Sequence, residues 1–237
     1  MTEQDRPDTT GSPVTKSAAD IAKLWDAIAP SYDQQIEDDE VQNNAIAGQV
    51  LESLHCDPHT VLDLACGTGL TVSEILRFTH PQRLVAVDIS EQMLKQLRNK
   101  HPDDPRIVPI QASIDDYLTG CNETFDLITA VGIIPQLPLP GKVIEIGSNL
   151  LNPGGYMIFN FEPIMLENPD QDAHEYPFQN SRTGTTKKVR RQHPDEMLGL
   201  IQRNGLVPIT RQRYSPVPRY PSQKVDIVAV KKPKTNM

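Results

Sequence analysis

VLDLACGTGL, residues 61–70, joins an apolar run to two closely spaced glycines. The run predicts a buried strand over 60–65, and the residues that follow the glycines predict a helix over 71–78. Gly67 and Gly69 let the backbone take positive φ values and approach a ligand closely. A strand, a glycine turn and a helix in this order favour a site for a nucleotide-containing cofactor at the carboxyl end of a parallel sheet.

Strands and helices alternate through the rest of the chain, and the apolar strands read as buried on both faces, which is typical of a parallel sheet. Further strands are predicted at 83–88, 106–110, 125–131, 156–161, 206–214 and 224–231, and helices at 91–100, 142–150 and 194–204. A proline-rich turn between the last two strands favours an antiparallel pair. We therefore expect an α/β domain with a seven-stranded, mostly parallel sheet and an antiparallel last strand.

The N-terminal residues and residues 164–192 lack this alternation of strands and helices. Residues 1–17 are polar and aperiodic, which predicts a disordered tail, and one domain is expected over 18–237. Helical periodicity over 18–55, interrupted by Pro30, predicts two N-terminal helices. Residues 164–192 have little periodicity until the basic run KKVRR at 187–191, and they are expected to form an insertion.

Composition limits the classes of function. The formal net charge is −8, so nucleic acid is a disfavoured partner. The three cysteines form no CxxC pair, and no metal site is expected. No apolar run approaches the roughly 20 residues that span a bilayer, and the first residues lack a secretory pattern, so we expect a cytoplasmic protein. The sequence names neither an acceptor substrate nor an oligomeric state.

Two acidic residues refine the choice of cofactor. Asp88 ends the second strand, about 20 residues beyond the glycines, which is the spacing of a carboxylate that binds ribose hydroxyls. Asp63 lies inside the first strand, where it would repel a pyrophosphate and attract a cationic amine. The third glycine of a dinucleotide fingerprint is also absent from Thr71–Ser73. These features favour a cofactor with an amine over a dinucleotide.

Several stretches together carry a family resemblance. They are DLACGTG (63–69), AVDISEQML (86–94), QASIDDY (111–117), FDLITAVGIIPQL (125–137), LLNPGG (150–155) and WDAIAPSYD (25–33). Over roughly residues 25–231 the chain resembles the class I S-adenosylmethionine (SAM)-dependent methyltransferases, whose motif I reads D-x-G/A-C-G-T-G. WDAIAPSYD is similar to the small-molecule, ubiquinone-methyltransferase-like or type 11 group. The resemblance implies a Rossmann-like fold, with residues 18–55 as a helical lid and 164–192 beside the methyl acceptor.

The resemblance also implies how SAM would lie. Its methionine end would face the first strand and its glycine turn, namely Asp63, Ala65, Gly67 and Gly69. Asp88 would hold the ribose, and Ile89 and Met93 would flank the adenine. Ser113 and Ile114 would lie at the adenine edge, where the family often has an aspartate, so Asp115 or a backbone carbonyl is an alternative acceptor. Val131 and Gly132 would pass beside the sulfur.

Three side chains are candidates for the acceptor side. Tyr32 lies in the expected lid, with simple packing as its alternative role. Glu162 ends the fifth strand, and its alternative is a solvated loop carboxylate. His193 could act as a base near neutral pH or cap the helix that follows it. The basic run at 187–191 is interpreted as an exposed edge strand, or as a site at which Arg190 or Arg191 recognises an acidic acceptor.

The function predicted on this basis is SAM-dependent methylation of an oxygen or nitrogen of a small molecule, with S-adenosylhomocysteine (SAH) as product. A protein or RNA methyltransferase and a non-catalytic SAM-binding protein of the same fold are the alternatives. A dehydrogenase that uses a dinucleotide is disfavoured by Asp63 and by the missing third glycine. SAM could also serve another chemistry, such as an electrostatic role in a rearrangement.

Overall fold

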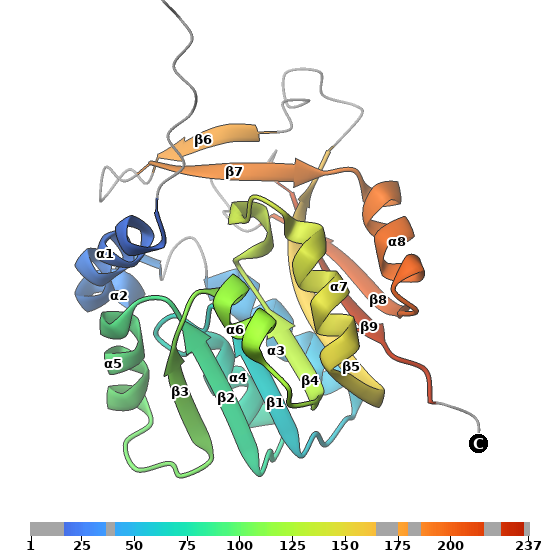
Figure 1. The fold of residues 1–237 in the computed structure, drawn as a ribbon, viewed down its shortest axis with the longest axis horizontal. Helices are drawn as coiled ribbons and strands as arrows, with labels where there is room; N and C mark the ends of the chain where they lie inside the picture. Colours follow the sequence, from blue (N-terminus) through green and yellow to red (C-terminus); the bar gives the residue numbers. More distant parts are fainter. Residues whose placement is uncertain (1–16, 37–40, 165–174, 180–185, 216–223, 235–237) are drawn as a thin grey trace, which may run out of the picture.

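Seven strands of a nine-stranded sheet lie in the order β3-β2-β1-β4-β5-β9-β8, and two further strands join this sheet at the end of β5 (Figure 1). The strands from β3 to β5 are all parallel, and β9 is antiparallel to both β5 and β8, so the predicted topology is confirmed. Their bounds are β1 Thr60–Leu64, β2 Arg83–Asp88, β3 Ile107–Gln111, β4 Phe125–Ala130, β5 Leu151–Pro163, β8 Val207–Tyr214 and β9 Val225–Lys231.

The structure is a computed structural model that describes residues 17–36, 41–164, 175–179, 186–215 and 224–234. The tail predicted for 1–17 lies, apart from Ser17, outside the described residues. Ser17 caps the first helix, where its hydroxyl accepts a hydrogen bond from the Asp20 N–H. Within the described parts of the chain, no helix has the length and apolar character needed to cross a bilayer.

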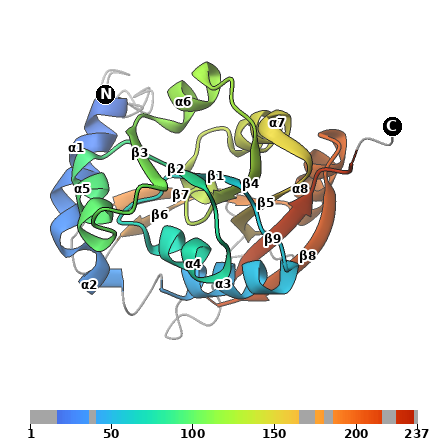
Figure 2. The same cartoon turned by 90° about the horizontal axis from the view of Figure 1, so that it is seen from below.

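Two layers of helices cover the two faces of the sheet (Figure 2). One face packs against α3 Val41–Leu54, α4 Leu70–Phe78 and α5 Glu91–Lys100. The other face packs against α6 Ile114–Gly120, α7 Pro140–Leu150 and α8 Pro194–Arg203. Because strands β1, β2 and β4 are buried from both sides, their side chains are apolar almost throughout.

The N-terminal helices lie at one side of the carboxyl edge of the sheet, next to α5 (Figure 1). They are α1 Ala18–Ile28, the 3₁₀ turn η1 Ala29–Ser31 and α2 Tyr32–Ile36. Pro30 lies in the 3₁₀ turn and separates the two α-helices, as its missing N–H requires. No side chain of α1 is fully buried, so its apolar contacts with the core are few.

The predicted insertion contains a hairpin that the sequence did not reveal. Strands β6 Glu175–Gln179 and β7 Thr186–Gln192 are antiparallel, and β7 pairs with the end of β5 through Glu162 and Arg191. The interpretation of residues 187–191 as an exposed edge is therefore wrong, because β7 lies between β5 and β6 and its Val189 is buried. The edge strand is β6, whose Pro177 obscures the strand pattern.

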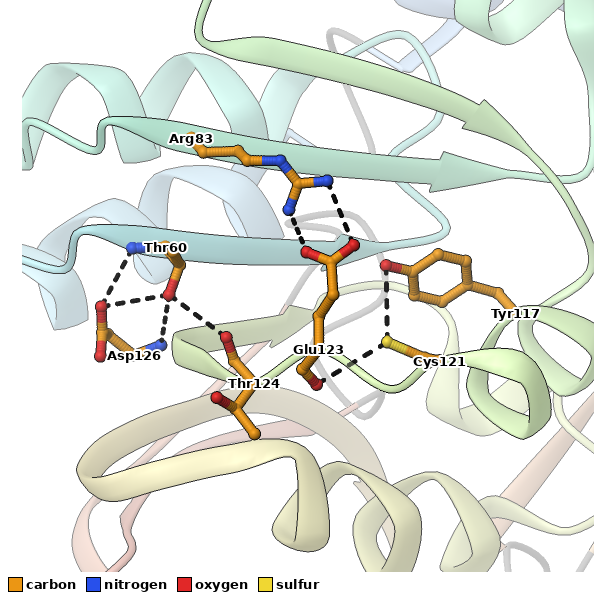
Figure 3. Close-up of polar contacts among 7 residues, drawn as sticks. All are labelled: Thr60, Arg83, Tyr117, Cys121, Glu123, Thr124 and Asp126. Carbon is orange, nitrogen blue, oxygen red and sulfur yellow. Dashed lines mark hydrogen bonds and ion pairs between the residues drawn. The ribbon is translucent and has the colours of Figure 1, made fainter.

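The amino edge of the sheet is held by a polar network (Figure 3). The Asp126 carboxylate accepts hydrogen bonds from the His59 and Thr60 N–H groups, both at 3.0 Å, and from the Asn152 amide at 2.8 Å. Partial burial would raise the pKa of Asp126, but the hydrogen bonds from Asn152, Thr60 and His59 outweigh it and hold the pKa below its ordinary value. This carboxylate therefore fixes the start of β1 against β4.

We expect Asp126→Ala to lower the free energy of unfolding by about 1–3 kcal/mol, because it leaves two backbone N–H groups without their acceptor. The loss should shrink as the pH falls through the lowered pKa of Asp126, since protonation weakens the same contacts in the wild type. Urea denaturation at several pH values measures both effects. Glu123→Gln, which removes the charge of an exposed pair with Arg83, is the control and should cost less than about 1 kcal/mol.

Candidate active site

The glycine turn between β1 and α4 is tight and uses left-handed backbone conformations. Ala65, Gly67 and Gly69 have φ values of 56°, 54° and 89°. The Gly69 N–H donates to the Cys66 carbonyl at 2.9 Å, which closes the turn, and Gly69 then caps α4. Ala65 is a non-glycine residue in a region that L-residues rarely adopt, at a cost of about 1–3 kcal/mol. Such strain is common where a backbone is shaped to receive a ligand.

The two glycines of the turn have different surroundings. A Cβ added at Gly67 would meet nothing within 4 Å, whereas one at Gly69 would lie 2.3 Å from Leu97 Cδ1. Gly132, after β4, has a φ of 79° and also faces open space. Gly67 and Gly132 thus form a cradle at the carboxyl edge, while Gly69 allows α4 to pack closely against α5.

Asp88 links the glycine turn to the turn after β2. Its Oδ2 accepts a hydrogen bond from the Gly67 N–H at 2.9 Å, and its Oδ1 accepts one from the Ser90 N–H at 2.8 Å. The side chain is buried, and burial raises the pKa of Asp88 despite these hydrogen bonds. A carboxylate has about four acceptor positions, so capacity is left for the hydroxyls of a ribose.

Asp63 is the most unusual ionisable group of the site. Its Oδ1 accepts a hydrogen bond from the Thr129 hydroxyl at 2.5 Å, and its Oδ2 is buried without a hydrogen-bond partner among the described residues. Burial, with a further contribution from the charge of Asp88, raises the pKa of Asp63 to about 7. An unpartnered buried carboxylate oxygen beside a second carboxylate favours a cationic ligand and disfavours an anionic one.

These features fit SAM. The open space at Gly67 and Gly132 offers room, and the two carboxylates offer negative charge to a ligand with an ammonium and a sulfonium group. The residues predicted for the adenine lie at the same edge: Met93 is buried, and Ile89, Ser113 and Ile114 are half-buried. The Ser113 hydroxyl caps α6 through Asp116, and the alternative, Asp115, pairs with Lys142 at 3.0 Å. The assignments to the ribose and adenine stay predictions.

The loop after β4 is fixed by a residue that sequence reasoning missed. The Gly132 N–H donates to Oδ1 of the buried Asn160 on β5, at 2.7 Å. The Asn160 amide in turn donates to the phenol oxygen of Tyr214, whose hydroxyl donates to Asn43 of α3 at 2.5 Å. Val131 precedes this fixed glycine and is half-buried. The sequence offered one signal that Asn160 holds this loop. Asn160 lies near the end of the strand that pairs with β4, and Gly132 follows β4.

The three acceptor-side candidates lie at two sides of the carboxyl edge. Tyr32 begins α2 and packs edge-on against Trp25, with ring centroids 6.1 Å apart. Glu162 is buried at the end of β5, with its Oε2 3.9 Å from Nε of Arg191, so it is not a solvated loop carboxylate. His193 occupies the N-cap position of α8, but its side chain makes no capping hydrogen bond. Tyr32 is therefore on the α1–α2 side, and the other two are on the β5–β7 side (Figure 1).

The two arginines of the basic run make local contacts. Arg190 donates to the Gln136 and Leu137 carbonyls at 3.3 and 3.1 Å and to Glu175 at 2.7 Å. These contacts fasten the β6–β7 hairpin to the loop after β4. Arg191 faces Glu162, so the charge of each arginine is balanced by a carboxylate. Among the described residues, no group of three His, Cys, Asp or Glu side chains could hold a metal ion.

Comparison with known proteins agrees with this geometry. A family profile described as a methyltransferase domain matches residues 61–155, the span that contains the glycine turn, Asp88 and the loop after β4. A ubiquinone biosynthesis O-methyltransferase of Coxiella burnetii is 29% identical over 164 residues, which are 66% of this chain and 68% of that protein. The profile and this relative support a class I SAM-dependent methyltransferase.

Solved structures share the fold of this chain at low sequence identity. The 1,6-didemethyltoxoflavin-N1-methyltransferase of Burkholderia thailandensis, solved with SAH, has a TM-score of 0.65 and 19% identity and covers 94% of this chain and 93% of its own. The [4+2]-cyclase SpnF has a TM-score of 0.67 and 12% identity and covers 93% and 98%. The same fold therefore supports more than one chemistry.

The contrast between the two glycines gives a prediction. Gly67→Ala should cost only about 1–2 kcal/mol of stability, the strain of a left-handed alanine, because its Cβ meets no neighbour. It should nevertheless reduce SAH affinity by about tenfold or more, because the methyl group enters the cradle. Calorimetric titration and thermal unfolding measure the two effects.

Gly69→Ala is the matched comparison in the same turn. Its Cβ would overlap Leu97, so we expect a loss of about 2–4 kcal/mol in unfolding free energy. Equal losses of stability in the two variants, or unchanged SAH affinity for Gly67→Ala, would contradict the distinction between a cradle and a packing glycine.

The raised pKa of Asp63 predicts a pH dependence of stability. Between about pH 4 and 7 the folded protein keeps a proton that the unfolded chain has released, so stability falls as the pH rises through this range. The Asp63→Asn variant lacks this titration. Relative to that variant, the wild-type apoprotein should lose about 1–3 kcal/mol between pH 5 and pH 8. Urea denaturation of both proteins at both pH values is the measurement, and parallel pH profiles would contradict the assignment.

Proposed function

We propose that this enzyme transfers the methyl group of SAM to an oxygen or nitrogen of a small-molecule acceptor and releases SAH. The observation that carries the proposal is the buried Asp63 carboxylate, whose second oxygen has no partner among the described residues, beside the open cradle of Gly67. A cationic amine placed there would satisfy that oxygen. A dinucleotide pyrophosphate would meet repulsion from Asp63.

The chain's own residues would bind and orient the reactants. When bound, SAM supplies an electrophilic methyl group on a sulfonium, so the protein needs mainly to align the acceptor and exclude water. We assign Asp63, Ala65, Gly67 and Gly69 to the methionine end of SAM and Asp88 to its ribose. Ile89, Met93, Ser113 and Ile114 are assigned to the adenine, and Val131 to the side of the sulfur.

A small acceptor is favoured by the relatives and by charge. The relative from Coxiella burnetii is named for ubiquinone biosynthesis and the structural neighbour from Burkholderia thailandensis for methylation at N1. The net charge of −8 opposes binding to the phosphate backbone of RNA. The β6–β7 hairpin runs across the carboxyl edge, from above the N-terminal helices toward α8, and we expect the acceptor to enter between these elements (Figure 1).

The proton of the acceptor needs a destination when the acceptor is a hydroxyl. We propose Glu162 and His193, on the β5–β7 side, as the candidate bases. Glu162 is buried at the end of β5, and its Oε2 lies 3.9 Å from Nε of Arg191. Tyr32, on the opposite side, is proposed to orient the acceptor with its hydroxyl. An amine acceptor would require none of these as a base.

Titration of the purified protein with SAM, SAH and NAD in parallel tests the cofactor. We expect SAM and SAH to bind and NAD not to bind. Asp88→Ala should weaken SAH binding by about 1–3 kcal/mol, because charge-assisted hydrogen bonds to the ribose are lost. Asp57→Ala, which removes a carboxylate 75% exposed beside His80, is the control and should leave affinity unchanged.

Methyl transfer itself is tested with methyl-labelled SAM and a panel of hydroxyl-bearing and nitrogen-bearing small molecules. Labelled product from any of them supports the proposal. Binding of NAD alone would overturn the cofactor assignment. Tight SAM binding with labelled protein or labelled RNA, and no labelled small molecule, would instead favour the macromolecular alternatives. Binding without any methyl transfer would favour a SAM-binding protein with another chemistry.

A further inference from the structure

The N-terminal helices α1 and α2 make specific polar contacts with the rest of the domain. No side chain of α1 is fully buried, and Ala29 of η1 is the one residue in 17–34 that the structure shows as buried. Leu24, Trp25 and Ile28 are half-buried, so apolar burial contributes to the attachment of this segment as well. Two charged side chains also reach from this segment to the turns of the cofactor site.

Asp26 of α1 contacts the turn that presents Asp88. Its Oδ1 accepts a hydrogen bond from the Ser90 hydroxyl at 2.6 Å and one from the Gln92 N–H at 3.1 Å. Ser90 is completely buried, and its own N–H donates to Asp88. The position of α1 is thus coupled to the carboxylate that we assign to the ribose of SAM.

Asp33 of α2 contacts the glycine turn. Its Oδ1 accepts a hydrogen bond from the Thr68 hydroxyl at 2.6 Å, and its Oδ2 lies 2.6 Å from Nζ of Lys100. Lys100 also donates to the Thr68 hydroxyl oxygen at 3.0 Å, which closes a triangle of three contacts. The side chains of Lys100 and Asp33 are only 27% and 37% exposed, so water screens this pair less than an ordinary surface pair.

Thr68 stands between Gly67 and Gly69, inside the turn that faces the methionine end of SAM. The triangle therefore joins three segments: α2, the glycine turn and the last residue of α5. Moving α2 away from the turn requires breaking the ion pair between Asp33 and Lys100 and the hydrogen bond between Thr68 and Asp33. Because α1 and α2 lie at the carboxyl edge, their release would open the cofactor site on this side (Figure 1).

We propose that Asp33 and Lys100 are positioning residues that clamp the N-terminal helices over bound SAM and slow the departure of the cofactor and of SAH. This proposal rests on the cofactor site proposed above. The clamp acts through Thr68 and the helices, so its loss should raise the dissociation rate of SAH more than it lowers the association rate. Added salt should also speed dissociation, because it screens the pair.

Lys100→Met tests the clamp, with Arg98→Met as its matched control. Arg98 lies on the same helix and pairs with Glu91 of that helix, with both side chains 45–46% exposed. In stopped-flow experiments, Lys100→Met should speed SAH dissociation by about tenfold, and Arg98→Met should change it by less than about twofold. An equal change in the two variants, or none in Lys100→Met, would overturn the proposal.

Two further variants exclude general unfolding as the cause. Asp33→Asn removes the charge of the partner and should reproduce the fast dissociation. The double variant Asp33→Lys with Lys100→Asp restores the pair with reversed polarity, and it should recover slow dissociation to within about threefold of the wild type. A double variant as fast as the single ones would contradict an ion-pair clamp.

Amide hydrogen exchange of the apoprotein tests the clamp without the cofactor. Exchange over residues 18–34 should be faster in Lys100→Met than in Arg98→Met, while exchange in β1 and β4 stays the same. If the wild type bound neither SAM nor SAH, the proposed function would fail, and this exchange experiment would still decide whether the clamp exists. Unchanged exchange over 18–34 in Lys100→Met would overturn the clamp even with SAH binding intact.

Discussion

The carboxyl edge of this sheet is organised by one carboxylate that joins two turns. Asp88 accepts hydrogen bonds from the N–H groups of Gly67 and Ser90, which belong to the turns after β1 and β2. The left-handed conformation of Gly67 and the start of α5 are thereby fixed relative to each other. The N-terminal helices are fastened to the same two turns, through Thr68 and Ser90. The cofactor site and the N-terminal helices are therefore held by the same two turns.

Local sequence patterns were sufficient to predict the central sheet and the glycine turn. Apolar strands alternating with amphipathic helices can form few arrangements, and the spacing from Gly67 to Asp88 spans one helix and one strand. The sequence therefore predicted a mostly parallel sheet with an antiparallel last strand, and it placed Asp63 and Asp88 at the ends of two of its strands. It missed α6, whose short span offers little periodicity, although Ser113 and Asp116 form an N-terminal capping signal.

The residues that sequence reasoning missed act over long distances along the chain. Asp33 meets Thr68 and Lys100, and Asp26 meets Ser90, at separations that no local pattern encodes. The β6–β7 hairpin was missed for a similar reason, because β7 is a strand only by pairing with β6 and with the end of β5. The basic run at 187–191 showed that these residues are charged, but it did not indicate which residues they would contact.

The two ends of the sheet show how the same residue type serves stability at one edge and ligand binding at the other. At the amino edge, Asp126 is surrounded by donors, and its pKa is lowered. At the carboxyl edge, Asp63 has an unpartnered oxygen among the described residues, and burial raises its pKa to about 7. A buried group left unsatisfied destabilises the apoprotein, and it persists because a cationic ligand can complete it. The position of this incomplete group, rather than the fold alone, favours SAM as the ligand.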